Sequence, residues 1–281
     1  MRKTLFSGIA ACLLATAATA AEQSPSVIWT VGQADRSASE FALAPDRFRD
    51  FLANDFGYED KYFLVGHSVP AADFPYVLPG PADTWGGTWP TSGWRTHQVN
   101  ILFGLKEIPS DGTCTLVVDL LDYAKNFLPL VKVSVNTQDA KFQLDAPGLS
   151  VADQRKPNQM EKIVDTLSIT GNLAKATPRR LEIPIRPGVL KAGGNEVTIT
   201  VLEGSWILFD RVSLEGPAGT NVEQPQQLFI RNIEAAPYEL ADGKRRVQPL
   251  LVDLEWLEGA PALSVELDGK EILNPVSYTH L

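Results

Sequence analysis

The chain has 281 residues, a formal net charge of −9 at pH 7 and a hydrophobic fraction of 44%. This length allows one large domain or two modest ones, and the apolar content suffices for a buried core. The acidic balance disfavours nucleic acid and anionic membrane surfaces as partners, whereas neutral ligands are compatible with it.

The first 20 residues have the pattern of a secretory signal peptide. Arg2 and Lys3 precede an apolar run from Leu5 to Ala15, which is shorter than the ~20 residues of a transmembrane helix. We therefore expect residues 1–20 to be removed and the chain to be secreted, periplasmic or extracellular, with no membrane partner. The alternative of lipoprotein processing at Cys12 leaves a still shorter apolar run before the cysteine.

One cysteine, Cys114, is left when residues 1–20 are removed. A lone thiol forms no internal disulfide, and Cys114 lies in the apolar run Thr113–Val118, so we expect a buried structural residue. Removal of the basic signal also lowers the net charge from −9 to −11.

Alternating apolar and polar residues predict a β-rich region between Val99 and Glu215. Short runs of this kind, separated by Pro, Gly, Asp and Asn, are typical of a sandwich or jelly roll. The predicted strands are Val99–Leu105, Thr115–Leu121, Val131–Val135, Leu181–Ile185, Val197–Val201 and Trp206–Leu214. We expect the last to be central because both its faces carry apolar residues. Pro184 indicates an edge or a bulge.

Helical signals are scarce. Ser37-Ala38-Ser39-Glu40 fits a capping box before residues 41–43, and Met160–Leu167 has room for two helical turns. Gly193-Gly194-Asn195 is predicted as a turn. Two short helices cannot supply the repeated helices of an α/β fold, so the fold class is predicted to be all-β, a jelly-roll sandwich.

The polar segment 218–226 predicts a linker between a jelly-roll domain at 21–217 and a partial immunoglobulin-like domain at 227–275. The second domain has candidate strands at Leu228–Ile233, Val247–Leu257 and Ala262–Leu267, and an Asp268-Gly269 hairpin turn. So few residues are marginal for independent stability. The last six, 276–281, resemble translated sequencing adaptor, so we expect a non-native tail and a longer natural chain.

The most unusual segment, residues 74–94, combines Pro and Gly with three tryptophans that fall within ten residues. Such a segment is predicted to be a long loop, and indole rings held on it suit the apolar faces of sugar rings. Polar neighbours would orient the hydroxyl groups. The candidate carbohydrate-binding residues are Tyr76, Asp83, Trp85, Trp89, Trp94, Arg95 and His97. In the alternative, one or two tryptophans fold inward and close the end of the sandwich.

Catalytic motifs are sparse. Gly66-His67-Ser68-Val69-Pro70 resembles a nucleophile elbow, but it lacks the final glycine, and Val69–Pro75 is a poor start for the helix that should follow. Motifs for zinc or nucleotide phosphates are missing from the sequence. A glycosidase pair of carboxylates cannot be recognised from spacing alone. We expect no catalytic residue and no cofactor here, although a structural calcium ion is compatible with the sequence.

Several stretches resemble domain III of family 4 polysaccharide lyases, the rhamnogalacturonan lyases. They are Ile28–Ser37, Leu190–Ile199 and Ser205–Glu215, with Asn136 at a strand end, and the resemblance covers about residues 27–217. It implies a carbohydrate-binding jelly roll related to galactose-binding-like domains, usually an appendage of an enzyme. In those lyases the catalytic domain normally precedes the module. Here the module follows the signal peptide, which implies another polysaccharide-active enzyme, such as an α-mannosidase-like glycoside hydrolase.

We therefore predict a non-catalytic carbohydrate-binding accessory region of a secreted polysaccharide-degrading enzyme, a lyase or a glycoside hydrolase. Its partners would be a polysaccharide or oligosaccharide and a catalytic domain in the same full-length chain. Two alternatives are open: a structural sandwich that packs on that catalytic domain without binding sugar, and a lyase or glycosidase active in its own right.

Overall fold

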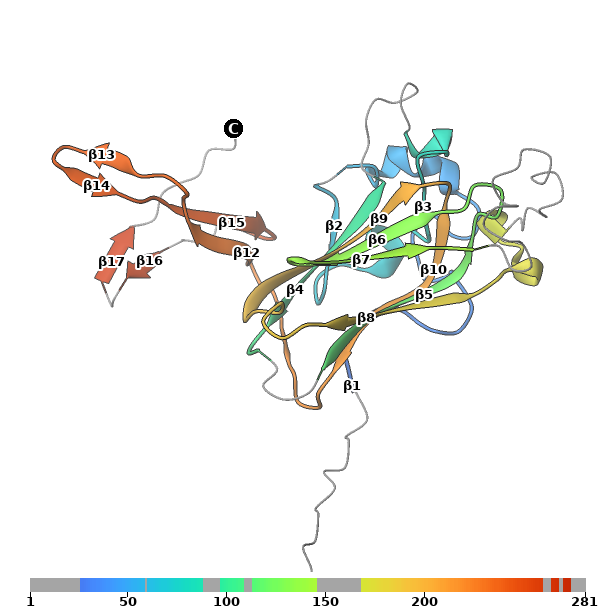
Figure 1. Ribbon diagram of the computed structural model, residues 1–281, viewed down its shortest axis with the longest axis horizontal. Helices are drawn as coiled ribbons and strands as arrows, with labels where there is room; N and C mark the ends of the chain where they lie inside the picture. The colour runs from blue at the N-terminus through green and yellow to red at the C-terminus, as the bar shows by residue number, and fades with distance from the viewer. Residues whose placement is uncertain are drawn as a thin grey trace, which may run out of the picture.

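The computed structural model describes residues 26–58, 60–87, 97–108, 113–145, 168–259, 264–267 and 270–273. These residues form a sandwich of two β-sheets, followed by a smaller unit of β-hairpins (Figure 1). The all-β fold class expected from the sequence is confirmed.

The first sheet is antiparallel, with strand order β1 (Ser26–Gly32), β10 (Ile207–Gly216), β5 (Cys114–Tyr123) and β8 (Arg179–Ile185). The short β3 (Val77–Leu78) pairs with the start of β10. β10 therefore lies inside the sheet, as its two apolar faces indicated. β8 lies at an edge, which agrees with the proline that it contains.

The second sheet has the order β11 (Val222–Glu223), β4 (Gln98–Leu105), β9 (Gly193–Glu203), β6 (Leu130–Val135) and β7 (Gln138–Gln143). β2 (Tyr62–Leu64) pairs in parallel with β4. The inward residues of both sheets form one core. It includes Val31, Leu116, Val118, Val212 and Leu214 from the first sheet and Ile101, Phe103, Val133, Val197 and Ile199 from the second. Each of the two sheets thus buries one face against the other sheet.

Cys114 at the start of β5 belongs to this core. Its side chain is buried, and burial raises the pKa of its thiol. A neutral, enclosed thiol packs as a small apolar group and is a poor nucleophile. This confirms the expectation of a structural cysteine.

Helical structure in the described residues consists of single turns: η1 (Phe48–Asp50), η2 (Leu52–Asn54), α1 (Pro70–Asp73), η3 (Thr84–Gly86), η5 (Ser168–Thr170) and η6 (Leu173–Lys175). The helix expected after the capping box at 37–40 is wrong. Glu40 Oε1 accepts from the Gln33 amide at 2.9 Å, and Ser37 hydrogen-bonds Ser39, so both side chains close turns instead. The second expected helix, 160–167, lies outside the described residues.

The turn expected at 193–195 is also wrong, because β9 begins at Gly193. The turn lies just before it. Asn195 closes that turn through its amide nitrogen, which donates to the carbonyls of Lys191 (2.8 Å) and Gly193 (2.9 Å). The glycines thus correctly indicated a nearby turn, but that turn ends before Gly193, where the extended chain of β9 begins.

The smaller unit is built on β12 (Leu228–Ala235), which pairs with β15 (Leu250–Trp256). Two further hairpins are β13 (Leu240–Asp242) with β14 (Arg245–Val247) and β16 (Val265–Leu267) with β17 (Lys270–Leu273). Strands therefore form in each of the three regions expected after the linker. The immunoglobulin-like assignment and the domain boundaries stay predictions.

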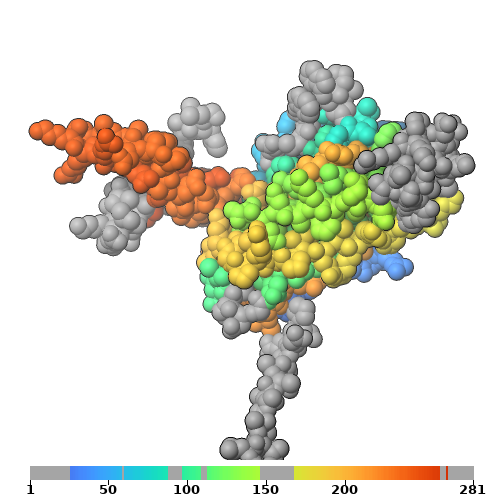
Figure 2. Space-filling view, in the orientation of Figure 1, coloured from blue at the N-terminus to red at the C-terminus, as the bar shows by residue number. Residues whose placement is uncertain are grey.

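This unit projects from the side of the sandwich (Figure 2). Several contacts join this unit to the sandwich. Phe229 is 7% exposed and packs with Leu64 and Leu102. A side-chain carbon at Gly194 would lie 2.3 Å from the carbonyl oxygen of Ile230, so only glycine lets β12 pass this close to β9.

Candidate functional site

The loop that follows β3 is fixed to the turn between β9 and β10 by Asp83. Its carboxylate accepts hydrogen bonds from Ser205 Oγ at 2.6 Å and from the Gly80 amide at 2.9 Å. Asp83 is 9% exposed; burial raises its pKa, and the bonds from Ser205, Gly80 and the Trp85 side chain oppose that rise. Asp83 therefore holds the base of the loop in place.

Glycine backbones make this close packing possible. A side-chain carbon at Gly80 would lie 2.5 Å from the carbonyl oxygen of Gly204. Gly204 itself has φ +83°, a conformation that other residues rarely adopt. The amide of Ala82 also donates to that Gly204 carbonyl at 2.9 Å. The base of the loop is thus rigidly seated on the end of the sandwich.

Trp85 is half-buried on an aromatic support. Its ring meets Phe48 edge-on, with centroids 5.1 Å apart, and Phe51 with centroids 6.0 Å apart. Edge-to-face pairs of this kind are worth about 0.5–1.5 kcal/mol beyond their buried area. The indole is therefore held in one orientation while part of its surface is open to solvent.

His97 is half-buried at the far end of the same loop. Its Nδ1 atom is buried and has no hydrogen-bond partner among the described residues. Burial lowers the pKa of the imidazole, so His97 is neutral near pH 7. A neutral imidazole has one donor and one acceptor, which suits a hydroxyl group.

Tyr76 differs from the other candidate residues. Its side chain is 1% exposed, and its hydroxyl donates to the Ile169 carbonyl at 2.6 Å. Burial is also the main reason why its pKa is raised. Tyr76 therefore lies in the core beneath the loop, where it has no surface to offer a ligand. Trp89, Trp94 and Arg95 lie outside the described residues.

Ser68, in the partial elbow motif, closes a turn. Its Oγ accepts from the Leu64 amide at 2.9 Å, and the one-turn helix α1 does follow at Pro70. A single turn lacks the aligned amides of the longer helix in hydrolases, so the structure does not support Ser68 as a nucleophile.

Within the described ranges, no group of three or more His, Cys, Asp or Glu residues could hold a metal ion. No helix in the described part has the length and apolar content to cross a membrane.

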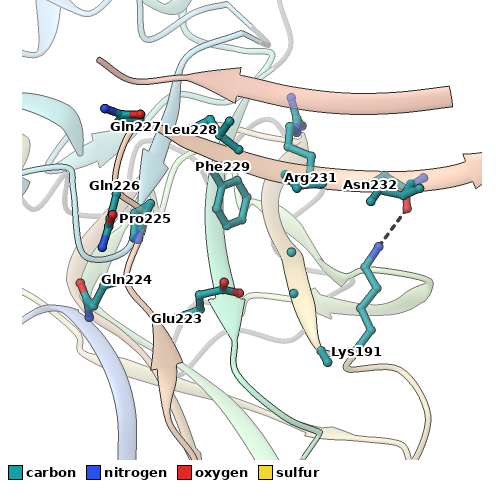
Figure 3. A pocket seen from close by; sticks show the side chains of 15 residues that line it. Lys191, Glu223, Gln224, Pro225, Gln226, Gln227, Leu228, Phe229, Arg231 and Asn232 are labelled. Carbon is teal, nitrogen blue, oxygen red and sulfur yellow. Dashed lines mark hydrogen bonds between the residues drawn. The ribbon is translucent and has the colours of Figure 1, made fainter. Parts of the chain in front are cut away.

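A second feature was missed by sequence reasoning. Two adjoining hollows, of about 790 Å³ and 520 Å³, flank β12, and we name them together the β12 cleft; Figure 3 shows the first of them. Their walls come from residues 191–198 at the start of β9, residues 223–227, and β12 itself, with Ser134, Asn136 and Asp253 at one end. The only sequence signal was the group of glutamines at 224, 226 and 227, the first two of which lie in the segment that we assigned to a linker.

Comparisons with known proteins identify the sandwich. The CBM-like family described as polysaccharide lyase family 4, domain III, matches residues 27–214. Among solved structures, the chain is similar to a family GH115 4-O-methyl-α-glucuronidase with specificity for decorated arabinogalactans, with 18% identity and a TM-score of 0.25. That match covers 42% of this chain and 13% of the glucuronidase, so the chain spans a small part of that enzyme. No curated protein matches the chain.

The family match extends from the second residue of β1 to Leu214 in β10 and so includes most of both sheets of the sandwich. It confirms the resemblance seen in the blocks at 28–37, 190–199 and 205–215. The chain belongs to the carbohydrate-binding-module-like family that is domain III of family 4 polysaccharide lyases.

Proposed function

We propose that this chain binds polysaccharide as a non-catalytic accessory region of a carbohydrate-active enzyme. The observation that carries the proposal is Trp85, whose indole is fixed at the end of a carbohydrate-binding-like sandwich by Phe48, Phe51 and Asp83. A rigid, partly exposed indole can stack on a pyranose with little loss of side-chain entropy.

The other candidate residues extend this platform in the proposal. Trp89, Trp94 and Arg95 follow Trp85 in the same loop, and His97 ends it. The tryptophans would add stacking surfaces, and the guanidinium and imidazole groups would hydrogen-bond hydroxyls. Asp83 would act indirectly, through its hold on Gly80 and Ser205.

The parent protein is part of the same proposal. A binding module raises the local concentration of a catalytic domain on its polymer, so we propose a lyase or glycoside hydrolase in the same full-length chain. Residues 1–20 would direct that protein to the periplasm or the medium.

Isothermal titration tests the proposal. The chain without residues 1–20 is titrated with pectic, mannan and arabinan oligosaccharides. Trp85→Ala, Trp89→Ala and Trp94→Ala should each weaken binding of the preferred sugar by about tenfold, because stacking on one aromatic contributes roughly 1–2 kcal/mol. The control is Trp256→Ala, which removes an indole from β15. An equal loss in the control, or no heat with any sugar, would refute the proposal.

A structural role is the second candidate, and one face of the smaller unit favours it. The cross-strand pairs of β12 and β15 on this face are Leu228–Trp256, Ile230–Leu254, Ile233–Val252 and Ala235–Leu250. Ile233 is 54% exposed and Leu250 48% exposed. A contiguous apolar face of this kind is typical of a protein interface.

The structural role predicts that this face packs against further protein. Wild-type chain should then bind a hydrophobic dye such as ANS or self-associate in sedimentation velocity. The double variant Ile233→Lys/Val252→Lys should lose both properties while its sandwich still unfolds at the same temperature. A wild-type monomer without dye binding would exclude the structural role.

A further inference from the structure

We propose that the β12 cleft is a second saccharide site, selective for neutral sugars and separate from the tryptophan loop. It shares the ligand class of the proposed function, but it rests on a different part of the molecule. The two hollows have four lining residues in common, Lys191, Gly194, Arg231 and Asn232, so they form one continuous space around β12. Volumes of ~300–1,000 Å³ are typical of sites for small ligands.

One wall of the cleft is bare backbone. Gly193 has φ +78°, and a side-chain carbon there would meet nothing within 4 Å. Gly194 beside it must be glycine because β12 passes so close. A flat ring can therefore approach this wall at Gly193 without meeting a side chain, and the small exposed part of Phe229 (7%) adds an apolar edge to the cleft (Figure 3).

The remaining walls carry amide groups. Gln224, Gln226, Gln227 and Asn232 each have one acceptor and an N–H₂ donor, the combination that matches the hydroxyl rim of a sugar. Lys191 Nζ donates to Asn232 Oδ1 at 3.1 Å (Figure 3), which orients that amide with its nitrogen away from the lysine. Glu223 adds a carboxylate, which can accept strong bonds from a pair of hydroxyls.

The charges of the cleft select against acidic sugars. Its lining includes two basic residues, Lys191 and Arg231, and four acidic residues. Arg231 is already paired with Glu255 at 2.9 Å and Glu196 at 3.4 Å. An incoming uronate would find a guanidinium held by other carboxylates and an excess of negative charge. The geometry therefore suits a neutral saccharide.

The cleft is built from both units, since Lys191–Gly194 belong to the sandwich and Leu228–Ile233 to the smaller unit. A ligand that bridges these walls stabilises their contact by mass action. Binding should therefore reduce proteolysis within the linker 218–226, which binding at the tryptophan loop would leave unchanged.

The test is a ¹H–¹⁵N NMR titration of the chain without residues 1–20. The probes are neutral arabinan and mannan oligosaccharides, with polygalacturonate fragments as the acidic comparison. Side-chain amide signals of Gln224, Gln226, Gln227 and Asn232 report on the cleft, and indole signals of Trp85 and its neighbours report on the loop. We expect a neutral sugar to shift the amide signals and the polygalacturonate fragments to leave them unchanged.

Two variants define the outcome. Glu223→Gln should weaken the titration of the amide signals by about tenfold, because a charge-assisted bond contributes roughly 1.5–3 kcal/mol. Glu182→Gln, the same change on β8 of the other sheet, should not. Shifts in the indoles alone overturn the second site and leave the proposed function intact. Shifts in the amides alone support the second site while removing the loop site. Equal shifts with polygalacturonate, or none in the amides at millimolar sugar, overturn this inference.

Discussion

Phe229→Ala is the change that most directly probes how the smaller unit is held. The Phe229 side chain is 7% exposed and packs on Leu64 and Leu102. Burying a phenylalanine is worth about 1.5–3 kcal/mol. The ion pairs of Arg231 lie at a half-exposed boundary and contribute roughly 0–1 kcal/mol, so they cannot replace it.

We therefore expect Phe229→Ala to weaken docking of β12 and β15 by about 2–3 kcal/mol, a rise of roughly 30- to 150-fold in the undocked population. Hydrogen exchange by mass spectrometry measures this. Amides of β12 and β15 should exchange faster, while those of β5 and β10 in the sandwich core should keep their protection.

The control is Ile233→Ala, which truncates a side chain on the opposite, exposed face of β12. It should leave exchange in the linker and in β2 unchanged. Unaltered protection of β12 and β15 in Phe229→Ala would refute the reasoning, as would an equal loss of protection throughout the sandwich.

Three further predictions concern the sandwich. Burial, followed by the nearby carboxylates, raises the pKa of Asp210 to about 6 against an ordinary 3.8, so the contribution of Asp210 to stability is most favourable below about pH 4 and is lost as the pH rises to about 6. Asp210→Asn should therefore raise the free energy of unfolding at pH 7 by at most about 3 kcal/mol, and with it the melting temperature, but should change neither at pH 3.5. Equal gains at both pH values would contradict this. Asp122 is fully buried and accepts from Lys125 Nζ at 2.8 Å, so Asp122→Ala should cost about 3–5 kcal/mol in urea unfolding. Adding Lys125→Met should recover part of that loss, and simple additivity would argue against a buried pair. Gly80→Ala should cost about 1–3 kcal/mol in thermal unfolding, because its new carbon meets backbone at 2.5 Å, and an unchanged melting temperature would show that the loop base is not rigid.

The sequence predicted strands with one solvent-exposed face, and also the strands β4, β5 and β10, which are buried on both faces. β6, β8 and β9 alternate apolar and polar residues because one side of each is in the core. β7 has few apolar residues, and it forms because Asn136, with φ +48°, turns the chain back to pair with β6. Its extended state is imposed by pairing, which no local pattern records.

The capping-box error has a similar cause. Ser37 and Glu40 have the right types and spacing, but Glu40 is drawn to the Gln33 amide at the end of β1. A capping-box sequence does not form a helix when a donor elsewhere in the fold hydrogen-bonds the side chain that would cap it.

The candidate site was predictable only in part. The sequence identified the tryptophan loop from its composition, but it could not show that Tyr76 faces the core or that Asp83 is bonded to Ser205, 122 positions away. The β12 cleft escaped prediction entirely. Residues 191–194 and 223–232 meet there because Phe229 docks on β2 and β4, and none of these segments has a binding motif of its own.

A crystal structure of the chain with a bound oligosaccharide would show most directly whether the tryptophan loop binds sugar. We expect a pyranose ring to lie against the exposed part of the Trp85 indole, with at least one further contact from the residues between Trp85 and His97. A structure in which Trp85, Trp89 and Trp94 are all enclosed by protein, with no sugar beside them at saturating concentration, would contradict it.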